Sequence, residues 1–411
     1  LGGLVSVGRR ILGIIERMEA TDETGSLLSA FTGNYVLPGP SGIITRGRED
    51  ILPTGRNFYA LDPRRLPTRA AWRVGQNLAR ALIAKHLEEE GRYPENVAMF
   101  WMCNDMMWAD GEGMGQLLYL LGVVPRWLGN GMVEGFDVIP LEELGRPRID
   151  VTVRVSGLLR DSFPAAMHML DAAVQAVAAL DEPLESNFVR KHTQERLAAI
   201  EADDPDAWRS ATFRIFSEPG TYQAGVNLAV YASAWQTEAD LADIFLHWNG
   251  YAYGKDAFGV KRPRALEASL STVDVTYNKV VSDEHDLFNC CGYYGTHGGM
   301  TAAASHFRGG QVKTYYGDTR EPEQVQVRDL TDEVRRVVRL LNPKWIEGMK
   351  RHGYKGAGDI SKRTGRVYGW EATTQAVDDW IFDDIAKTFV LDPETRAFFD
   401  ENNPWALEEI A

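Results

Sequence analysis

The sequence predicts an α/β protein in which a mainly parallel sheet with flanking helices occupies the first half, followed by a mostly helical region with long loops rich in Gly and Tyr. Short apolar runs alternate with helical patterns between about residues 95 and 195, as in parallel sheets covered by helices. Beyond residue 200, apolar side chains recur at helical spacing around two loops at 217–225 and 289–299. We therefore expect a helical and loop segment over 1–92, an α/β domain over 93–200 and a mostly helical region over 201–411.

The first segment begins with an amphipathic run that includes Val5, Ile11 and Ile15. It then passes into a stretch rich in Gly and Pro at 36–57, a composition typical of loops with special backbone conformations. Loops of this kind often line binding sites. A helix is predicted to begin at Pro67 and to end near Glu90.

The α/β domain is predicted from continuous apolar runs of strand length and from the helical patterns between them. We expect strands at 96–103, 136–139 and 149–156, and helices at 114–121 and 161–180. In parallel sheets, ligands bind beyond the carboxyl ends of the strands. This rule places Cys103–Asp105 and Ser156–Asp161 near a predicted crevice.

The last region is predicted to be mostly helical because its apolar residues keep a spacing of three and four. The two clearest runs are Val334, Val337, Val338 and Leu341, and Val377, Trp380, Ile381 and Ile385. The loops between such runs contain the Gly-rich and Tyr-rich stretches.

Composition excludes several classes of protein. The 411 residues are 44% hydrophobic and 25% charged, which is typical of a globular chain. The net charge of −14 argues against a nucleic-acid partner. No apolar stretch is long enough to span a membrane, and an odd set of 3 cysteines is not a secreted disulfide framework, so we expect reduced thiols and a cytoplasmic protein.

Familiar catalytic motifs are absent from the sequence. It contains no G-x-x-x-x-G-K-[ST] phosphate loop, no dinucleotide fingerprint, no G-x-S-x-G elbow and no H-E-x-x-H. The chain itself is therefore not expected to hydrolyse ATP, and the commonest hydrolases and dehydrogenases are excluded.

A segment with metal-binding side chains runs from Asp286 to Met300 and contains the adjacent pair Cys290 and Cys291, six residues before His297. Thiolate and imidazole groups suit borderline and soft metals. Adjacent cysteines do not have a zinc-finger spacing, and buried cysteines most often pack as small apolar groups. From these residues alone, both metal binding and core packing remain open.

Several charged strings recur at the ends of the predicted elements, and each by itself is typical of helix caps or solvated ion pairs. Together with neighbouring strings, they resemble the large subunit of the tetrapyrrole metal chelatases, the family of CobN of cobaltochelatase and of its relative in magnesium chelatase, the H subunit. The strings that carry the resemblance are 35–42, 52–58, 141–150, 156–161, 181–192, 219–222, 341–345 and 352–356. Because that large subunit is considerably longer, the resemblance implies a fragment from its C-terminal half.

The resemblance is closer to the cobalt branch, to which His297-Gly-Gly-Met300 and Tyr251-Ala-Tyr-Gly254 are similar. It implies the ring-binding and metal-inserting subunit of an ATP-dependent cobaltochelatase in cobalamin biosynthesis. A magnesium or nickel chelatase subunit, or a tetrapyrrole- or metal-binding module without insertion activity, is the alternative. The implied partners are an AAA+ ATPase subunit and a subunit with an integrin-like metal-dependent domain.

The implied chemistry needs groups that accept two pyrrole protons and transfer a divalent ion, with cobalt favoured over nickel or magnesium. We predict His297 and Glu185 for these roles, with Asp286, Cys290 and Cys291 as accessory metal ligands beside His297. Arginine forks suit the carboxylates of the ring and aromatic faces suit the ring itself. The predicted binders are Arg56, Arg160, Arg190, Tyr222, Tyr293 and Tyr294.

The chain departs from the common cobalt-branch pattern at one place. Asn289-Cys290-Cys291-Gly292 stands where a run of aspartates precedes the tyrosines. Thiolates favour cobalt, nickel, iron or zinc over magnesium, which prefers oxygen. This segment is therefore the predicted determinant of metal choice.

Overall fold

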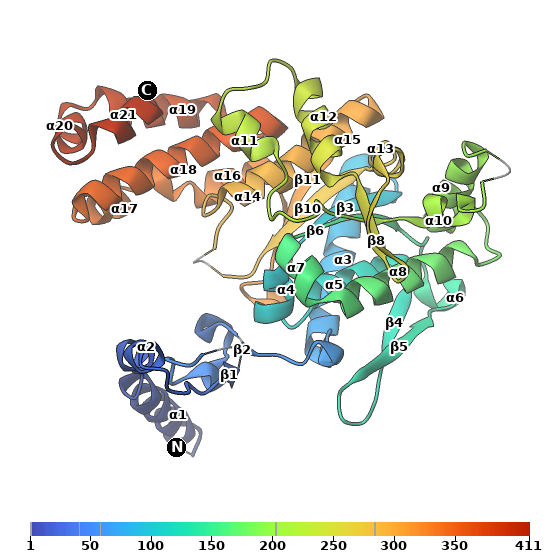
Figure 1. Ribbon diagram of the computed structural model, residues 1–411, viewed down its shortest axis with the longest axis horizontal. Helices are drawn as coiled ribbons and strands as arrows, with labels where there is room; N and C mark the ends of the chain where they lie inside the picture. Colours follow the sequence, from blue (N-terminus) through green and yellow to red (C-terminus); the bar gives the residue numbers. More distant parts are fainter. Residues whose placement is uncertain (1, 41, 58, 202–203, 283–284) are drawn as a thin grey trace.

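A mostly parallel sheet forms the centre of the computed structural model, which describes residues 2–40, 42–57, 59–201, 204–282 and 285–411 (Figure 1). Within these residues, eight strands pair in one sheet. Their order is β12 (Gln326–Asp329), β11 (Lys313–Asp318), β10 (Val275–Val280), β3 (Asn96–Trp101), β6 (Asp150–Val155), β7 (Ile215–Phe216), β8 (Tyr251–Gly254) and β9 (Ala257–Lys261). The pairs from β11 through β7 are parallel, and β12, β8 and β9 extend the sheet as antiparallel edges. The predicted α/β class is confirmed.

Both faces of the sheet are buried, because side chains alternate across each strand. In β3, Val97, Met99 and Trp101 join one apolar cluster while Ala98 and Phe100 join the other. The first face is covered by α3 (Arg69–Glu90), α5 (Glu112–Leu121) and α8 (Pro164–Ala178). The second is covered by α12 (Glu238–Asn249), α13 (Pro263–Leu270), α15 (Gly299–Arg308) and α18 (Gly353–Thr374).

Helix α3 confirms the helix predicted from Pro67 to Glu90 and shows why it begins and ends there. Thr68 accepts a hydrogen bond from the Ala71 amide at its N-terminus, and Gly91 at φ 69° ends it. A Cβ on Gly75 would lie 2.5 Å from the carbonyl oxygen of Glu112 in α5. The missing side chain at residue 75 therefore lets these two helices pack closely.

The strands expected at 96–103 and 149–156 are present as β3 and β6, whereas the strand expected at 136–139 is not part of the eight-stranded sheet. It lies within β5 (Val133–Val138), which pairs with β4 (Val123–Trp127) in a separate antiparallel hairpin. The main sheet also continues past residue 200, because β7 through β12 all come from residues 215–329. These strands were not predicted, and they join the α/β segment to the first part of the region expected to be mostly helical.

The two ends of the chain form helical extensions of the body (Figure 1). At the N-terminus, α1 (Gly2–Glu19) and α2 (Glu23–Phe31) lie beside the short parallel pair β1 (Gly39–Pro40) and β2 (Tyr59–Ala60). At the C-terminus, a helical arm continues from the sheet: α16 (Leu330–Val337), α17 (Pro343–Lys350), α18, α19 (Asp379–Ile385), α20 (Pro393–Asn402) and α21 (Pro404–Ile410). None of the helices in the described ranges has the length and apolar character needed to cross a bilayer.

The remaining short helices occupy the connections. They are α4 (Cys103–Trp108), α6 (Leu141–Leu144), α7 (Gly157–Ser162), α9 (Phe188–Ala198), α10 (Ala207–Thr212), α11 (Val226–Tyr231), α14 (Cys291–Tyr293), and two π-helical segments, Tyr294–Gly298 and Ala386–Leu391. Single 3₁₀ turns occur at Ile44–Arg46, Glu49–Ile51, Pro63–Arg65, Pro322–Gln324 and Arg339–Leu341.

Candidate functional site

The sheet has a topological switch point between β3 and β10. From β3 the chain crosses one face through α5 and reaches β6, whereas from β10 it crosses the other face through α15 and reaches β11. The loops that leave the carboxyl ends of β3 and β10 therefore separate, which is where open α/β sheets bind ligands.

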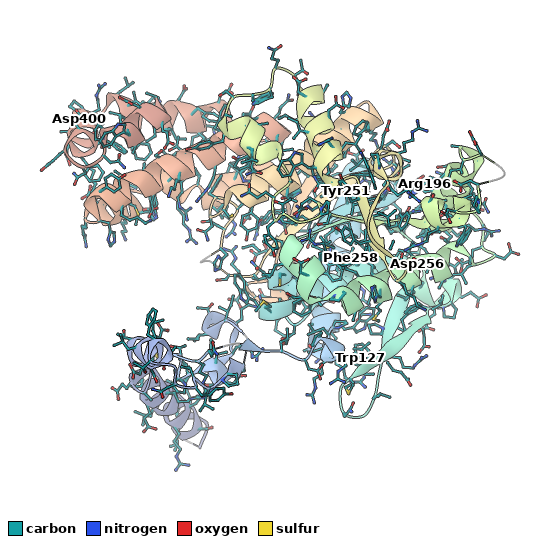
Figure 2. All side chains as sticks on the ribbon, in the orientation of Figure 1. Trp127, Arg196, Tyr251, Asp256, Phe258 and Asp400 are labelled. Atoms are coloured by element: carbon teal, nitrogen blue, oxygen red, sulfur yellow. The ribbon has the colours of Figure 1, made fainter. Side chains whose placement is uncertain are left out.

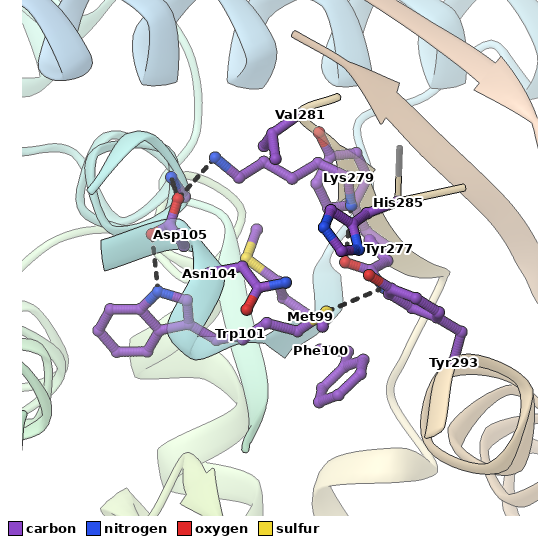
Figure 3. A pocket seen from close by; sticks show the side chains of 13 residues that line it. Met99, Phe100, Trp101, Asn104, Asp105, Tyr277, Lys279, Val281, His285 and Tyr293 are labelled. Carbon is purple, nitrogen blue, oxygen red and sulfur yellow. Dashed lines mark hydrogen bonds and ion pairs between the residues drawn. The ribbon is translucent and has the colours of Figure 1, made fainter. Parts of the chain in front are cut away.

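A small cavity lies at this switch point (Figure 3). Its volume is about 20 Å³, enough for about one water molecule. Asn104, predicted near a crevice, lines it from the β3 side together with Trp101. Lys279, His285 and Tyr293 line it from the β10 side. The cavity thus presents an amide, an ammonium, an imidazole and a phenol beside an aromatic wall.

A buried charge network supports the floor of the cavity. Asp105 accepts hydrogen bonds from the amides of Gly113 (2.7 Å) and Met114 (3.0 Å) at the start of α5, and the Lys279 Nζ lies 2.6 Å from its Oδ1. The carboxylate of Glu112 pairs with the same ammonium group at 3.0 Å. All three charged groups are less than a tenth exposed, so they form a rigid support, and Asp105 has no lone pair left for a ligand.

Arg46 connects the N-terminal extension to this network. Its guanidinium donates to the carboxylate of Glu112 and to the carbonyl oxygens of Val281 (3.0 Å) and Thr319 (2.5 Å). Those carbonyls follow β10 and β11, so the loop around residue 46 is fixed against the carboxyl edge of the sheet. The Gly- and Pro-rich stretch predicted to line a site thus contributes one side chain to the support of this site.

His285 is the titratable ring that faces the cavity, and the sequence analysis did not select it. It stacks on Trp108 with ring centroids 4.5 Å apart, and the Nδ2 of Asn289 lies 3.0 Å from its Nδ1. These contacts fix the ring and leave Nε2 without a hydrogen-bond partner in the described parts of the chain. An imidazole held in this way can accept a proton or bind a borderline metal ion. The sequence signal that could have identified His285 is its position five residues after β10, but that strand was not predicted.

Two predicted ring binders, Arg160 and Tyr222, lie beyond the neighbouring strands β6 and β7. The guanidinium of Arg160 is buried, pairs side-on with Asp161 (2.7 and 3.0 Å) and donates to the Glu218 carbonyl. Tyr222 donates its hydroxyl to Asp161 at 3.1 Å and is 63% exposed. Arg160 lowers the pKa of Asp161, and the Asp161 carboxylate raises the pKa of Tyr222. Arg160 therefore orients this loop, while Tyr222 presents an aromatic face to solvent.

A second buried pair stabilises the same loop from below. The Arg154 Nη2 lies 2.5 Å from the Glu218 Oε2, and both side chains are almost fully buried. Burial raises the pKa of Glu218, and the charge of Arg154 opposes that shift. The loops after β6 and β7 are thus held by paired charges, as the loop after β3 is.

The predicted proton acceptor Glu185 and the predicted binder Arg190 lie at the opposite edge of the sheet. Glu185 is exposed in the loop before α9, and this loop pairs with Arg148 just ahead of the first residue of β6. Arg190 pairs with Asp181 at 2.9 Å and donates to the Glu182 carbonyl. The fold does not bring these two residues to the switch-point cavity.

Arg56 is also remote from the cavity, within the N-terminal extension. Its guanidinium donates to the carbonyl oxygens of Pro53 (3.1 Å) and Pro38 (3.3 Å). It therefore joins the two Pro-containing loops whose strings contributed to the family resemblance.

His297, predicted as metal ligand and base, is fully buried in the π-helical segment Tyr294–Gly298. Its ring packs against Tyr316 and Trp370, with centroids 6.2 and 5.6 Å away. Neither ring nitrogen has a normal hydrogen bond within the described residues. Burial lowers the pKa of His297 to about 3, against a smaller opposing effect of the Thr276 backbone. The ring is therefore neutral at physiological pH and closed off from solvent.

Of the two tyrosines next to His297, only Tyr293 reaches the cavity. Burial raises the pKa of Tyr293, so its phenol stays protonated and can act as a hydrogen-bond donor. Tyr294 is buried under α18, where its ring lies against Gly369.

The predicted metal ligands of the 286–297 segment are dispersed. Asp286 is buried, accepts from the Phe288 amide at 2.9 Å and pairs with Arg363 at 3.2 Å. Cys290 is exposed, and its Sγ lies 3.4 Å from the amide of Gly292. The side chain of Cys291 lies outside the described residues. Within the described parts of the chain, no group of three His, Cys, Asp or Glu side chains is placed to hold an ion.

Known proteins similar to this chain include cobaltochelatase and magnesium-chelatase subunits. A sequence profile of the family described as CobN/Magnesium Chelatase matches residues 7–411. An uncharacterised protein of Methanocaldococcus jannaschii is 62% identical over 405 residues, covering 98% of this chain and 32% of that protein. The aerobic cobaltochelatase subunit CobN of Pseudomonas aeruginosa is 41% identical over 396 residues (95% and 32%). The H subunit of the magnesium chelatase of Chlorobaculum parvum is 36% identical over 399 residues (95% and 31%).

A solved structure shows the same fold. The catalytic subunit of cobaltochelatase from Mycobacterium tuberculosis matches with a TM-score of 0.91 and 39% identity, covering 94% of this chain and 33% of that chain. The chain thus spans about a third of the length of these relatives.

Proposed function

Because the chain belongs to the CobN/magnesium chelatase family, we propose that it is part of the large subunit of a cobaltochelatase, which binds a corrinoid precursor and receives cobalt. The observation that carries this proposal is the switch-point cavity, where His285, Tyr293 and Lys279 from the β10 side face Asn104 from the β3 side, although the two strands are far apart in sequence. The family resemblance implies that partner subunits, an AAA+ ATPase and a subunit with an integrin-like metal-dependent domain, supply the ATP-hydrolysing step, and the 411 residues contain no phosphate loop.

The surroundings of the cavity suit an apolar ring that carries carboxylates. Asp286, next to His285, lies between two guanidinium groups, that of Arg363 at 3.2 Å and that of Arg339 at 4.0 Å. Tyr222 adds an exposed aromatic face beyond β7. Guanidinium groups bind carboxylates and aromatic faces stack on flat rings, so the ring is proposed to lie across the carboxyl edge of the sheet above the cavity.

In this arrangement His285 takes the roles for which the sequence analysis selected His297 and Glu185. Metal insertion requires that two pyrrole protons leave the ring and that the hydrated ion lose water. Nε2 of His285 is placed to accept a proton or to bind the ion before transfer. The phenol of Tyr293 and the ammonium of Lys279 act as hydrogen-bond donors to the substrate or to water.

The test is cobalt insertion by the full-length protein, with a metal-free corrinoid precursor and with or without the ATPase partners. We expect insertion only when ATP and partners are present, and we expect His285→Ala to reduce its rate at least tenfold, a typical contribution of a general base. The control is His247→Ala, which changes an exposed histidine on α12. His297→Ala and Glu185→Ala test the assignments made from sequence.

The outcomes separate the alternatives. Tight ring binding without ATP-dependent insertion of any ion would leave a tetrapyrrole-binding module and reject the enzyme. Insertion of magnesium or nickel in preference to cobalt would assign another branch of the family. A double Cys290→Ser and Cys291→Ser variant with unchanged metal preference would reject a role of the cysteines in metal choice. Unchanged insertion in His285→Ala would remove this histidine from the mechanism.

A further inference from the structure

A second, larger pocket lies away from the switch-point cavity, between the end of α9, the residues that follow it and the start of α13. Its volume is about 1060 Å³. The sequence analysis predicted no site there, and none of its lining residues lines the switch-point cavity. Arg196 lines this pocket, and Figure 2 shows it in the region of α9 and α10.

Arg196 is the unusual residue of this pocket. It is 8% exposed, and its Nη1 makes long hydrogen bonds to the carbonyl oxygens of Ala211 (3.4 Å) and Phe213 (3.5 Å). Its Nε and Nη2 have no hydrogen-bond partner in the described parts of the chain. Buried donors of a charged group are costly to leave unpaired, so their persistence points to a ligand that is absent here.

The neighbouring carboxylates Asp150 and Glu195 favour the charge of Arg196, but Asp150 is already paired with other groups. Asp150 pairs with Arg214 at 2.8 Å and with His192 at 2.9 Å, and Glu95 lies 3.3 Å from the other nitrogen of that histidine. Lys191 also pairs with Glu95, at 2.6 Å. In the described residues, the carboxylates of Asp150 and Glu95 are therefore already matched by Arg214 and Lys191, and they also contact the ring of His192, before Arg196 is added. Burial and the nearby Arg214 lower the pKa of Arg196 to about 9, so the group remains a cation at neutral pH but in an unfavourable field.

The rim of the pocket carries further charged groups of both signs. Lys261, Arg262 and Arg264 line it from the start of α13, and Glu201, Asp204 and Asp206 line it from the other side. The closest opposite charges on the rim, Arg262 and Asp206, are 3.9 Å apart. Among the described residues the rim carries three groups of each sign, and Arg196 adds one further positive charge.

We propose that this pocket binds an oxyanion, the phosphate or carboxylate group of a small molecule, and that Arg196 is its anchor. Nε and Nη2 are the adjacent donors of the guanidinium fork, which can hold two oxygens of one oxyanion side by side. Arg264 and Lys261 stand at the rim, where they can contact the rest of the ligand. The site is independent of the chelatase proposal, since it shares no residue with the cavity of His285.

The test is calorimetric titration of the purified full-length protein with inorganic phosphate, pyrophosphate and citrate at constant ionic strength. We expect saturable binding of at least one of these anions, and the phosphate and citrate titrations distinguish the two sources of the oxyanion. Arg196→Met should weaken binding by roughly 10- to 100-fold, because it removes both charge-assisted hydrogen bonds. Arg264→Ala should weaken it only a few-fold, and Arg126→Ala, on the distant β4–β5 hairpin, should not change it.

Thermal unfolding gives an independent measurement. The anion should raise the melting temperature of the unmodified protein but not that of Arg196→Met, whose own melting temperature without anion should be equal or higher because an unpaired buried charge is gone. If Arg196→Met does not fold, Arg196→Lys is the alternative variant. It keeps the charge but lacks the guanidinium fork, so it should bind the anion at least several-fold more weakly than the unmodified protein. No saturable binding of any of the three anions, or equal binding by the Arg196 variants, would overturn the proposal.

Discussion

Replacing Asp105 by Ala should destabilise the protein strongly, since this carboxylate supports the floor of the switch-point cavity. Besides the Lys279 ammonium at 2.6 Å, it accepts from the Trp101 Nε1 at 2.9 Å and from the amides of Gly113 and Met114. The substitution removes the only acceptor that these three neutral donors have among the hydrogen bonds of the described residues. It also leaves the buried ammonium with Glu112 alone.

The magnitude follows from these contacts. Removing one partner of a buried ion pair costs about 3–5 kcal/mol, and Glu112 keeps this case near the lower end. Each stranded neutral donor adds about 1 kcal/mol. The sum, about 6 kcal/mol, is comparable with the whole stability of many domains, about 5–15 kcal/mol. Asp105→Asn keeps the volume and one acceptor oxygen, so it should cost about half as much.

The assay is urea unfolding followed by far-UV circular dichroism. The matched control is Asp137→Ala, which breaks an ion pair with Arg126 of the same 2.6 Å length but with Asp137 57% exposed. Such surface pairs contribute about 0–1 kcal/mol. The expected order of destabilisation is Asp105→Ala, then Asp105→Asn, then Asp137→Ala. Equal unfolding midpoints for Asp105→Ala and Asp137→Ala would refute the claim that burial decides the strength of this network.

Three further predictions concern packing and pH. Gly75→Ala should destabilise the protein by about 1–3 kcal/mol in urea unfolding, because the added Cβ would lie 2.5 Å from the Glu112 carbonyl oxygen. The control is Gly13→Ala on α1, where nothing lies near the added Cβ, and it should be neutral or stabilising. Burial lowers the pKa of His297 to about 3, so on acidification His297 takes up a proton in the unfolded chain at a higher pH than in the folded protein. Stability should therefore fall as the pH drops from about 6.5 towards 3. His297→Leu should lessen this loss of stability between pH 7 and pH 5. The pKa of His192 is raised by the Asp150 and Glu95 carboxylates against the effect of burial, so its contribution is complete below about pH 6.5 and is lost as pH rises through the raised value. His192→Gln should therefore flatten the decline of stability from pH 6.5 upwards, and an unchanged slope in either histidine variant would contradict its assignment.

The strands that the sequence revealed are those with a clear run or alternation of apolar residues. Asn96–Trp101 is apolar from Val97 onwards, and Asp150–Val155 has valine at every second position, so both sequences predict strands. β10 contains Thr276, Asn278 and Lys279, and β7 has only two residues, so neither forms such a run. Their strand conformation depends on the neighbours with which they pair.

For the candidate site too, the sequence predicted the residues next to a recognisable strand and missed those that only packing identifies. The sequence predicted Asn104 and Asp105 near the crevice, because they directly follow a recognisable strand, and the structure places Asn104 at the cavity and Asp105 in its support. It selected His297 for its spacing from the cysteines and its Gly-Gly-Met context, and it did not select His285, which stands just before that segment. The fold buries His297 under Trp370 and leaves His285 facing the cavity.

The sequence by itself determined the α/β class, the two central strands, the long helix after Pro67 and, through its long ordered strings, the family. Local periodicity and motifs fix these features, since each depends on residues close together in the chain. Only the tertiary structure decided which histidine meets the cavity, which carboxylates are already paired and which two donors of Arg196 have no partner in the described residues. Those outcomes depend on β3 and β10 lying side by side although nearly 180 residues separate them, and on burial, which sets both the strength of a charge pair and the protonation of a ring.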